Sequence, residues 1–137
     1  MRRQVKKFYM ADKNKILVVD DNTAFIDMIV GIFGVDYDVD IALDGNEGFE
    51  KAKLNVPDLI LLDVNMPGMT GIEFARKLAA CRDTAQVPII VITASDYNSL
   101  TESLLRTEHN VKVFMTKLSP VDTIKEKVLA VINKEIL

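Results

Sequence analysis

The chain lacks the features that mark secreted and membrane proteins. It has a single cysteine, Cys81, which excludes an internal disulfide and is typical of a reducing compartment. No apolar run approaches the roughly 20 residues that a membrane-spanning helix needs. The basic residues at the start are not followed by the apolar segment of a secretory signal. We therefore expect a cytoplasmic protein that does not bind a membrane.

Positive charge is scarce beyond the first residues of the chain. The first 15 residues carry six Lys or Arg and one Asp, whereas the other 122 carry 11 Lys or Arg and 19 Asp or Glu. An acidic body of this kind argues against direct nucleic-acid binding. A total of 137 residues, 49% of them hydrophobic, suits a single core. The sequence predicts a flexible basic extension over residues 1–13 and one domain over residues 14–137.

Short apolar runs alternate along the chain with segments of helical periodicity. Continuous runs lie at residues 16–19, 59–62, 87–92 and 111–116. Such runs are typical of strands that helices cover on both faces of a sheet. Together with one further strand, they predict an α/β fold in which five parallel strands alternate with five helices.

The remaining strand is expected to differ, because apolar and acidic residues alternate in it with a period of two. The apolar positions are Val35, Tyr37, Val39 and Ile41, and aspartates separate them. This pattern predicts an edge strand that has one wet face and is protected by charge.

Two helices carry local signals that place them. Apolar residues at positions 25, 28, 29 and 32 share one helical face, which predicts a helix packed on the core after the first strand. Near the end of the chain, Ser119 is expected to cap the last helix and Pro120 to be its first residue.

Polar side chains follow the predicted central strands directly. Asp20 and Asp21 come after the first strand, Asp63 after the third, Thr93 after the fourth and Lys117 after the fifth. Because the carboxyl ends of parallel strands lie along one edge of the sheet, we expect these side chains to lie close together.

Three carboxylates in one place repel one another, and a hard divalent cation such as Mg²⁺ relieves the repulsion. With the metal and a lysine neutralising charge, a carboxylate oxygen can attack phosphorus, and a threonine hydroxyl can hydrogen-bond a phosphoryl oxygen. Taken singly, an acidic residue at a strand end often only caps a helix, and a lone threonine or lysine is usually structural. In combination they predict a phosphoryl-accepting site.

Four segments resemble the receiver domain of two-component response regulators, in the CheY-like superfamily. They are residues 16–22 (ILVVDDN), 61–71 (LLDVNMPGMTG), 91–94 (VITA) and 114–117 (FMTK). The resemblance covers about residues 14–135. It implies a flavodoxin-like (βα)5 three-layer sandwich with a parallel sheet of order 2-1-3-4-5.

The resemblance also implies a role for each matching residue. Asp63 would accept phosphate from the phosphohistidine of a sensor histidine kinase or phosphotransfer protein, with Thr93 and Lys117 contacting the phosphoryl group. Mg²⁺ would be held by Asp20, Asp21, Asp63 and the backbone carbonyl of Asn65.

The implied output is a conformational switch rather than a reaction on a separate substrate. Thr93 and Phe114 occupy the positions that would move when Asp63 is phosphorylated, and the fourth helix, fifth strand and fifth helix would change. A downstream protein partner, or an output domain missing from this chain, would respond to that change. The chain is expected to be no enzyme beyond its own phosphorylation and dephosphorylation.

Two departures from the family pattern stand out. Leu118 follows Lys117 where the family usually has proline, and residues 105–110 replace the small Gly-Ala-rich connection common before the fifth strand. These changes leave open how Lys117 is positioned and how the fourth helix ends.

Two other functions share parts of this pattern. Haloacid-dehalogenase-like phosphatases use a similar residue set, but they place a second Asp two residues after the nucleophile, where this chain has Asn65. Their metal-binding acids also come late in the chain, whereas Asp20 and Asp21 come early. A phosphorylation-independent interaction module of the same fold is the other alternative, which Leu118 favours and the complete acidic set disfavours.

Overall fold

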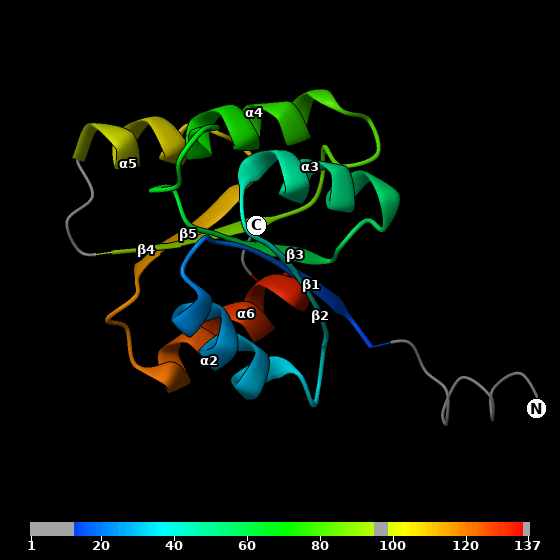
Figure 1. Cartoon of the computed structure of the whole chain (residues 1–137), viewed down its shortest axis with the longest axis vertical. Coiled ribbons are helices and arrows are strands. Elements are labelled where there is room, and N and C mark those ends of the chain that lie inside the picture. Colours follow the sequence, from blue (N-terminus) through cyan, green and yellow to red (C-terminus); the bar gives the residue numbers. More distant parts are fainter. Residues whose placement is uncertain (1–12, 95–98, 136–137) are drawn as a thin grey trace, which may run out of the picture.

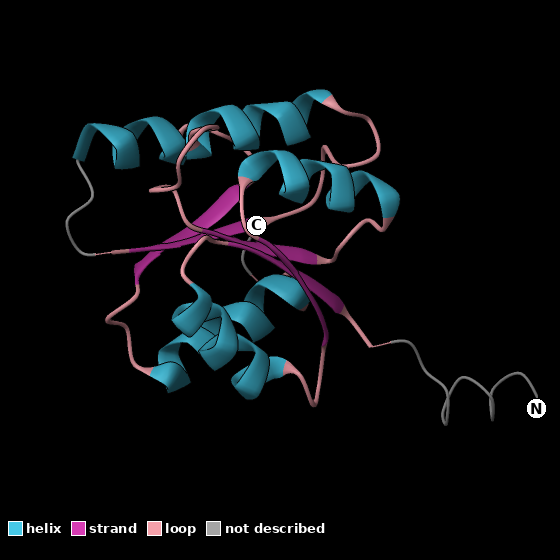
Figure 2. Ribbon diagram, in the orientation of Figure 1, coloured by secondary structure: helices cyan, strands magenta, loops and turns pink. Residues whose placement is uncertain are grey.

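The computed structural model describes residues 13–94 and 99–135, in which a parallel sheet lies between two layers of helices (Figure 1, Figure 2). The predicted basic extension lies, apart from Lys13, outside the described residues. The elements in chain order are β1 (Lys15–Val19), α2 (Thr23–Phe33), β2 (Asp38–Ala42), α3 (Gly45–Leu54), β3 (Leu59–Leu62), α4 (Gly71–Ala80), β4 (Ile89–Thr93), α5 (Ser99–Arg106), β5 (Val111–Thr116) and α6 (Val121–Ile132).

The strand order is β2-β1-β3-β4-β5 and all pairings are parallel, which confirms the predicted flavodoxin-like fold. Helices α3, α4 and α5 cover one face of the sheet, and α2 and α6 cover the other (Figure 1). Each face has its own apolar core, and β1, β3 and β4 are buried from both sides. None of the helices in the described ranges is long and apolar enough to span a bilayer.

The predicted edge strand is at the edge of the sheet, but it starts later than expected. Strand β2 begins at Asp38, and Val35 lies before it with 77% of its surface exposed. The backbone N–H groups of Asp36 and Tyr37 both donate to the carbonyl of Phe33, at 3.2 and 2.9 Å. These residues therefore form the turn that ends α2. The alternation of apolar and acidic residues begins before the strand does.

The start of α6 also differs from the expectation. The N–H of Ser119 donates to the carbonyl of Thr116 at 3.0 Å, so Ser119 belongs to the turn after β5. Pro120 is extended (φ −58°, ψ 146°) and precedes the first helical residue, Val121, and its side chain accepts no capping hydrogen bond. The prediction of Ser119 as the cap was therefore wrong by one residue.

Strand β5 contains a β-bulge at Lys112. Ile89 is paired with Val111 and the next residue, Ile90, with Val113, so Lys112 is an extra residue with no partner on β4. Val111 and Phe114 consequently pack on the face that α3, α4 and α5 cover, whereas Val113 and Met115 pack on the opposite face. A bulge with lysine on an exposed edge also discourages pairing with another strand.

Candidate functional site

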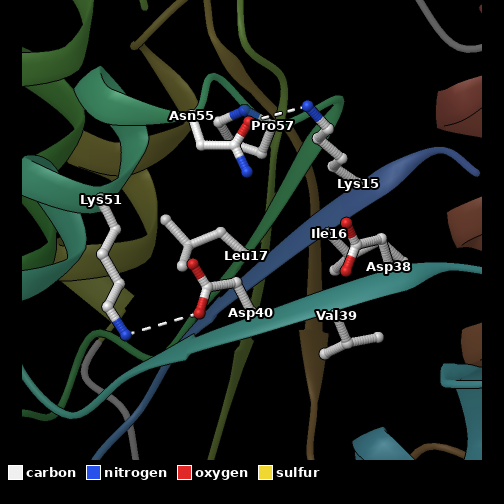
Figure 3. A pocket seen from close by; sticks show the side chains of 9 residues that line it. All are labelled: Lys15, Ile16, Leu17, Asp38, Val39, Asp40, Lys51, Asn55 and Pro57. Atoms are coloured by element: carbon white, nitrogen blue, oxygen red, sulfur yellow. Dashed lines mark hydrogen bonds and ion pairs between the residues drawn. The ribbon is translucent and has the colours of Figure 1, made fainter. Parts of the chain in front are cut away.

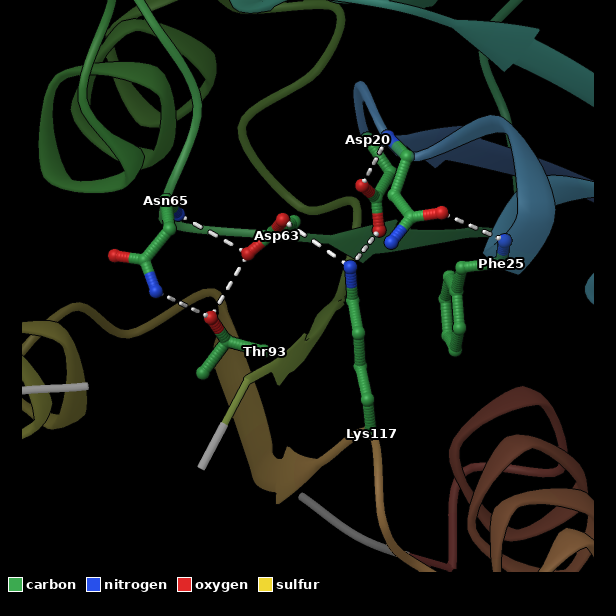
Figure 4. A network of polar contacts seen from close by, with 7 residues as sticks. Asp20, Phe25, Asp63, Asn65, Thr93 and Lys117 are labelled. Atoms are coloured by element: carbon green, nitrogen blue, oxygen red, sulfur yellow. Dashed lines mark hydrogen bonds and ion pairs between the residues drawn. The ribbon is translucent and has the colours of Figure 1, made fainter. Parts of the chain in front are cut away.

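The carboxyl ends of four strands bring the predicted polar residues to one edge of the sheet (Figure 4). Asp20 follows β1, Asp63 follows β3, Thr93 ends β4 and Lys117 follows β5. Oxygens of Asp20, Asp21 and Asp63 lie within 4.8 Å of one another. Asp20 and Asp63 are buried, whereas Asp21 is exposed.

In the turn from β1 into α2, both the backbone N–H and the side chain of Asp20 form hydrogen bonds. The Asp20 N–H donates to the carbonyl of Ala42 at 3.0 Å, and Oδ1 of Asp20 accepts from the Asn22 N–H at 2.9 Å. Asn22 in turn caps α2, because its Oδ1 accepts from the Phe25 N–H at 3.0 Å. The carboxylate and the first turn of the helix therefore form one rigid unit.

Asp63 is 5% exposed and each of its oxygens has a distinct environment. Oδ1 accepts hydrogen bonds from the Asn65 N–H at 3.0 Å and from the Thr93 hydroxyl at 2.8 Å. The side-chain amide of Asn65 donates to the same hydroxyl at 3.1 Å, which fixes the orientation of Thr93. Oδ2 faces the Lys117 ammonium at 3.3 Å.

Lys117 bridges two of the carboxylates. Its Nζ lies 2.8 Å from Oδ2 of Asp20 and 3.3 Å from Oδ2 of Asp63. The Lys117 N–H donates to the Thr93 carbonyl at 2.7 Å, which ties the lysine backbone to the end of β4. Every peptide bond in the described ranges is trans, including Lys117–Leu118, and the side chain reaches the site in this geometry.

The charges in this cluster shift one another's ionisation. Burial raises the pKa of Asp20 above its ordinary value, and the negative charge of Asp63 raises it further. Contact with Lys117 and the hydrogen bond from the Asn22 N–H oppose the rise without cancelling it. Burial by itself lowers the pKa of Lys117, but the contacts with Asp20 and Asp63 outweigh it, so that pKa is raised.

The donor set fits a hard divalent cation. Among the buried side-chain atoms of the described residues, Oδ2 of Asp20 has no hydrogen-bond partner, and its contact with Lys117 is an ion pair without hydrogen-bond alignment. A buried carboxylate oxygen in this condition, near the oxygens of Asp21 and Asp63, is a suitable ligand for Mg²⁺.

The loop that follows Asp63 is shaped by two glycines and a helix cap. Gly68 has a φ of +84°, a conformation that residues with a side chain rarely adopt. Thr70 and Glu73 form a capping box at the start of α4. Gly71 packs so closely that a Cβ there would lie 2.6 Å from Cγ1 of Val64.

Two aromatic rings, those of Phe114 and Phe25, each lie beside a cation. Phe114, predicted to be a switch residue, is half-buried on β5, and its ring centroid lies 5.5 Å from Cζ of Arg106 rather than at the carboxylates. Phe25 was expected only to pack in the core, yet its ring centroid lies 4.7 Å from the Lys117 Nζ (Figure 4). Its place in the first helical turn after a strand-end aspartate is the signal that identifies it.

A separate hollow of about 160 Å³ lies at the β2 edge of the sheet (Figure 3). Its two lysines have partners within the hollow, since Lys51 forms an ion pair with Asp40 at 3.4 Å and the Lys15 ammonium donates to the amide oxygen of Asn55 at 2.7 Å. The Lys51 ammonium also donates to the carbonyl of Ile41 at 2.6 Å. These interactions of Lys15 and Lys51 stabilise the edge strand, and the two ammonium groups are not arranged around a common ligand position.

Comparisons with known proteins agree with the fold. A family model for the response regulator receiver domain matches residues 16–129. The chain is 36% identical over 111 residues to response regulator PleD of Caulobacter vibrioides, an alignment covering 80% of this chain and 24% of PleD. It is 30% identical over 120 residues to protein PilH of Pseudomonas aeruginosa, covering 87% of this chain and 94% of PilH.

Solved structures show the same similarity. The response regulator receiver domain protein (CheY-like) from Methanospirillum hungatei superposes with a TM-score of 0.81 and 27% sequence identity, covering 90% of this chain and 96% of that one. The chain spans about a quarter of PleD but nearly all of PilH. All the polar residues gathered at the strand ends lie inside the segment that the family model matches.

Proposed function

The chain belongs to the response regulator receiver domain family, and we propose that it accepts a phosphoryl group on Asp63 with Mg²⁺ bound beside it. The observation that carries this proposal is the environment of the Asp63 carboxylate. It is buried at a strand end, its Oδ1 is held by two hydrogen bonds, and its Oδ2 faces an ammonium.

In the proposed reaction a carboxylate oxygen of Asp63 forms a bond to phosphorus while the N–P bond of a phosphohistidine breaks. The leaving imidazole nitrogen takes up a proton, and the product is an aspartyl phosphate. The hydrogen bonds from Asn65 and Thr93 fix the carboxylate in one orientation, so that little freedom is lost on the way to the transition state.

Lys117 and Thr93 supply the positive and hydrogen-bonding groups for the transferred phosphoryl oxygens. The ammonium of Lys117 lies 3.3 Å from Oδ2, close to where the negatively charged oxygens of a phosphoryl group attached to Asp63 would lie. Thr93 already donates to Asp63 and can donate to an oxygen attached there instead.

The residues proposed to hold the metal are Asp20, Asp21, Asp63 and the backbone carbonyl of Asn65. Bound there, Mg²⁺ supplies charge neutralisation for the phosphoryl oxygens. Two observations support this assignment: three carboxylates lie close together, and Oδ2 of Asp20 accepts no hydrogen bond.

We propose that the chain does not turn over phosphate esters. A phosphatase of the haloacid-dehalogenase type needs a carboxylic acid two residues after the nucleophile to protonate the leaving group. This position is Asn65, whose amide cannot do so and is engaged with Thr93.

The proposed phosphate donor is a sensor histidine kinase or a phosphotransfer protein in the cytoplasm. The proposed output is a change in the surface formed by α5, β5 and α6, which a downstream protein or an output domain would bind. Residues 14–137 would form the receiver domain and residues 1–13 a basic extension. The acidic body argues against direct binding of nucleic acid.

Labelling with radiolabelled acetyl phosphate and MgCl₂ tests the proposal. We expect an acid-stable, base-labile adduct on the wild type, none on Asp63→Ala, and full labelling on the control Asp36→Asn, whose side chain is exposed in the turn after α2. Full labelling of Asp63→Ala would refute the assignment.

Metal dependence is a second, separate expectation. Labelling should stop when EDTA removes divalent ions and return when Mg²⁺ or Mn²⁺ is added in excess, because the carboxylates otherwise repel the phosphoryl donor. Undiminished labelling in EDTA would contradict the metal site while leaving Asp63 as the acceptor.

A further inference from the structure

The ammonium of Lys117 has a third neighbour besides its two carboxylates. The Phe25 ring centroid lies 4.7 Å from Nζ, within the range of a cation–π interaction. We infer that Phe25 is a positioning residue of the phosphoryl site, whose ring face holds the Lys117 ammonium beside Asp63. This inference rests on the proposed function for its effect on phosphorylation, but the contact itself can be tested without it.

The ring is fixed by the same local structure that fixes Asp20. Asp20 accepts from the Asn22 N–H, and Asn22 accepts from the Phe25 N–H, so two consecutive hydrogen bonds connect the carboxylate to the aromatic residue (Figure 4). Phe25 is 8% exposed and packs in the core between the sheet, α2 and α6. A ring held in this way presents a constant face to the site.

The need for a third contact follows from competition for Asp20. Oδ2 of Asp20 now forms its ion pair with Lys117 at 2.8 Å, and the same oxygen, which accepts no hydrogen bond, is the proposed metal ligand. When that oxygen binds a divalent cation, the ammonium loses its closest carboxylate and is repelled by the metal charge. The Phe25 ring attracts a cation but offers no lone pair to a metal, so it can retain Lys117 without weakening metal binding.

The residue after Lys117 makes this contact more important. Leu118 is 79% exposed, so the residue that follows the lysine is not anchored in the core. Within the described residues, the side chain of Lys117 is therefore positioned by two carboxylates and one ring.

A series of phenylalanine analogues whose rings have progressively less electron density tests the inference with little change in the shape of the ring. Phe25 is replaced by mono-, di- and trifluorinated phenylalanine, which progressively weaken attraction for a cation. We expect the logarithm of the phosphorylation rate with acetyl phosphate, at saturating Mg²⁺, to fall steadily along the series. The trifluorinated protein should be slower by about tenfold, as expected for a desolvated cation–π contact.

Phe33 is the matched control. It lies on the same helix and in the same apolar core with 2% of its surface exposed, but its ring contacts that of Tyr37, with centroids 5.7 Å apart, rather than a cation. The same fluorinated series at Phe33 should leave the rate unchanged. A flat rate series at Phe25, in a wild type that is labelled at Asp63, would overturn the inference and make the ring a packing residue only.

An NMR readout keeps the inference separate from the proposed function. The side-chain protons next to Nζ of Lys117 should be shifted upfield by the ring current of Phe25, and Phe25→Leu should abolish the shift. If the wild type is not labelled at Asp63, the proposed function fails, and this shift alone decides the positioning contact. Its absence from the wild type overturns the contact, and its loss in Phe25→Leu supports it.

Discussion

Asp20 is a residue at which the requirements of folding and of the proposed metal site conflict. Its carboxylate is 1% exposed, lies near Asp63 and has one oxygen without a hydrogen bond. We expect Asp20→Asn to raise the thermal midpoint in EDTA by about 3 °C, or about 1 kcal/mol, because it removes a buried charge while Lys117 keeps Asp63.

Calorimetry with EDTA and with excess MgCl₂ checks this expectation. The wild type should gain stability from the metal, because only the folded state assembles the three carboxylates, and the variant should gain much less. Asp36→Asn serves as the control, because its exposed charge lies in the turn after α2. A midpoint for Asp20→Asn that falls below the wild type would show that its ion pair with Lys117 outweighs the repulsion.

The same residue predicts a pH dependence. The pKa of Asp20 is raised in the folded state, so the folded protein binds a proton before the unfolded chain does. As the pH falls through the raised pKa toward the ordinary value of 3.8, the wild type therefore gains stability relative to Asp20→Asn. The difference between the two midpoints in EDTA should shrink over this range, and a difference that grows would contradict the burial argument.

At the scale of elements, the start of α4 determines the shape of the loop beside the site. A Cβ on Gly71 would lie 2.6 Å from Cγ1 and 3.2 Å from Cα of Val64, and backbone can move little. We expect Gly71→Ala to lower the free energy of unfolding by about 1–3 kcal/mol and to slow the labelling of Asp63, because Val64 adjoins it.

A matched change in another helix should have the opposite sign. Gly31 lies exposed within α2, and a Cβ there meets nothing within 4 Å. Gly31→Ala should therefore stabilise the protein by about 1 kcal/mol through helix propensity alone. Urea denaturation measures both variants, and equal effects would show that the contact of Gly71 with Val64 is easily relaxed.

At the scale of the whole molecule, a path of contacts connects Asp63 to the α5–β5–α6 surface. Thr93 donates to Asp63, the Lys117 N–H donates to Thr93, and Phe114 is paired with Val91 on β4. Beryllofluoride with Mg²⁺, a mimic of the phosphoryl group, should therefore change NMR amide shifts within residues 99–125. Coupling of this kind is typically worth about 1–3 kcal/mol.

Thr93→Ala tests whether that path is used. The variant should still be labelled at Asp63, but the shift changes within residues 99–125 should be much reduced, because the hydroxyl that follows the phosphoryl group is gone. The exposed Thr23 provides the control Thr23→Ala. Shift changes confined to the surroundings of Asp63 in the wild type would show that the chain takes up phosphate without switching this surface.

The parallel strands and the polar residues of the site could be predicted from the sequence because both depend on local patterns, whereas the order of the strands was implied by the family resemblance. Continuous apolar runs mark buried parallel strands, and parallel strands end at one edge. Asp20, Asp63, Thr93 and Lys117 come at or directly after the ends of such runs, so their convergence follows from chain geometry. The capping box at Thr70 is equally local, because it needs residues only three positions apart.

Tertiary structure decided the contacts between residues distant in the sequence. The bulge at Lys112 depends on the pairing of β5 with β4, and it puts Phe114 on the same face as Val111, three positions earlier, where unbroken alternation would put the two on opposite faces. The contact of Lys117 with Phe25 joins residues 92 positions apart, on elements that meet only when the sheet is assembled. Periodicity reports which face of an element is apolar, but the neighbour across that face is set by packing of the whole chain.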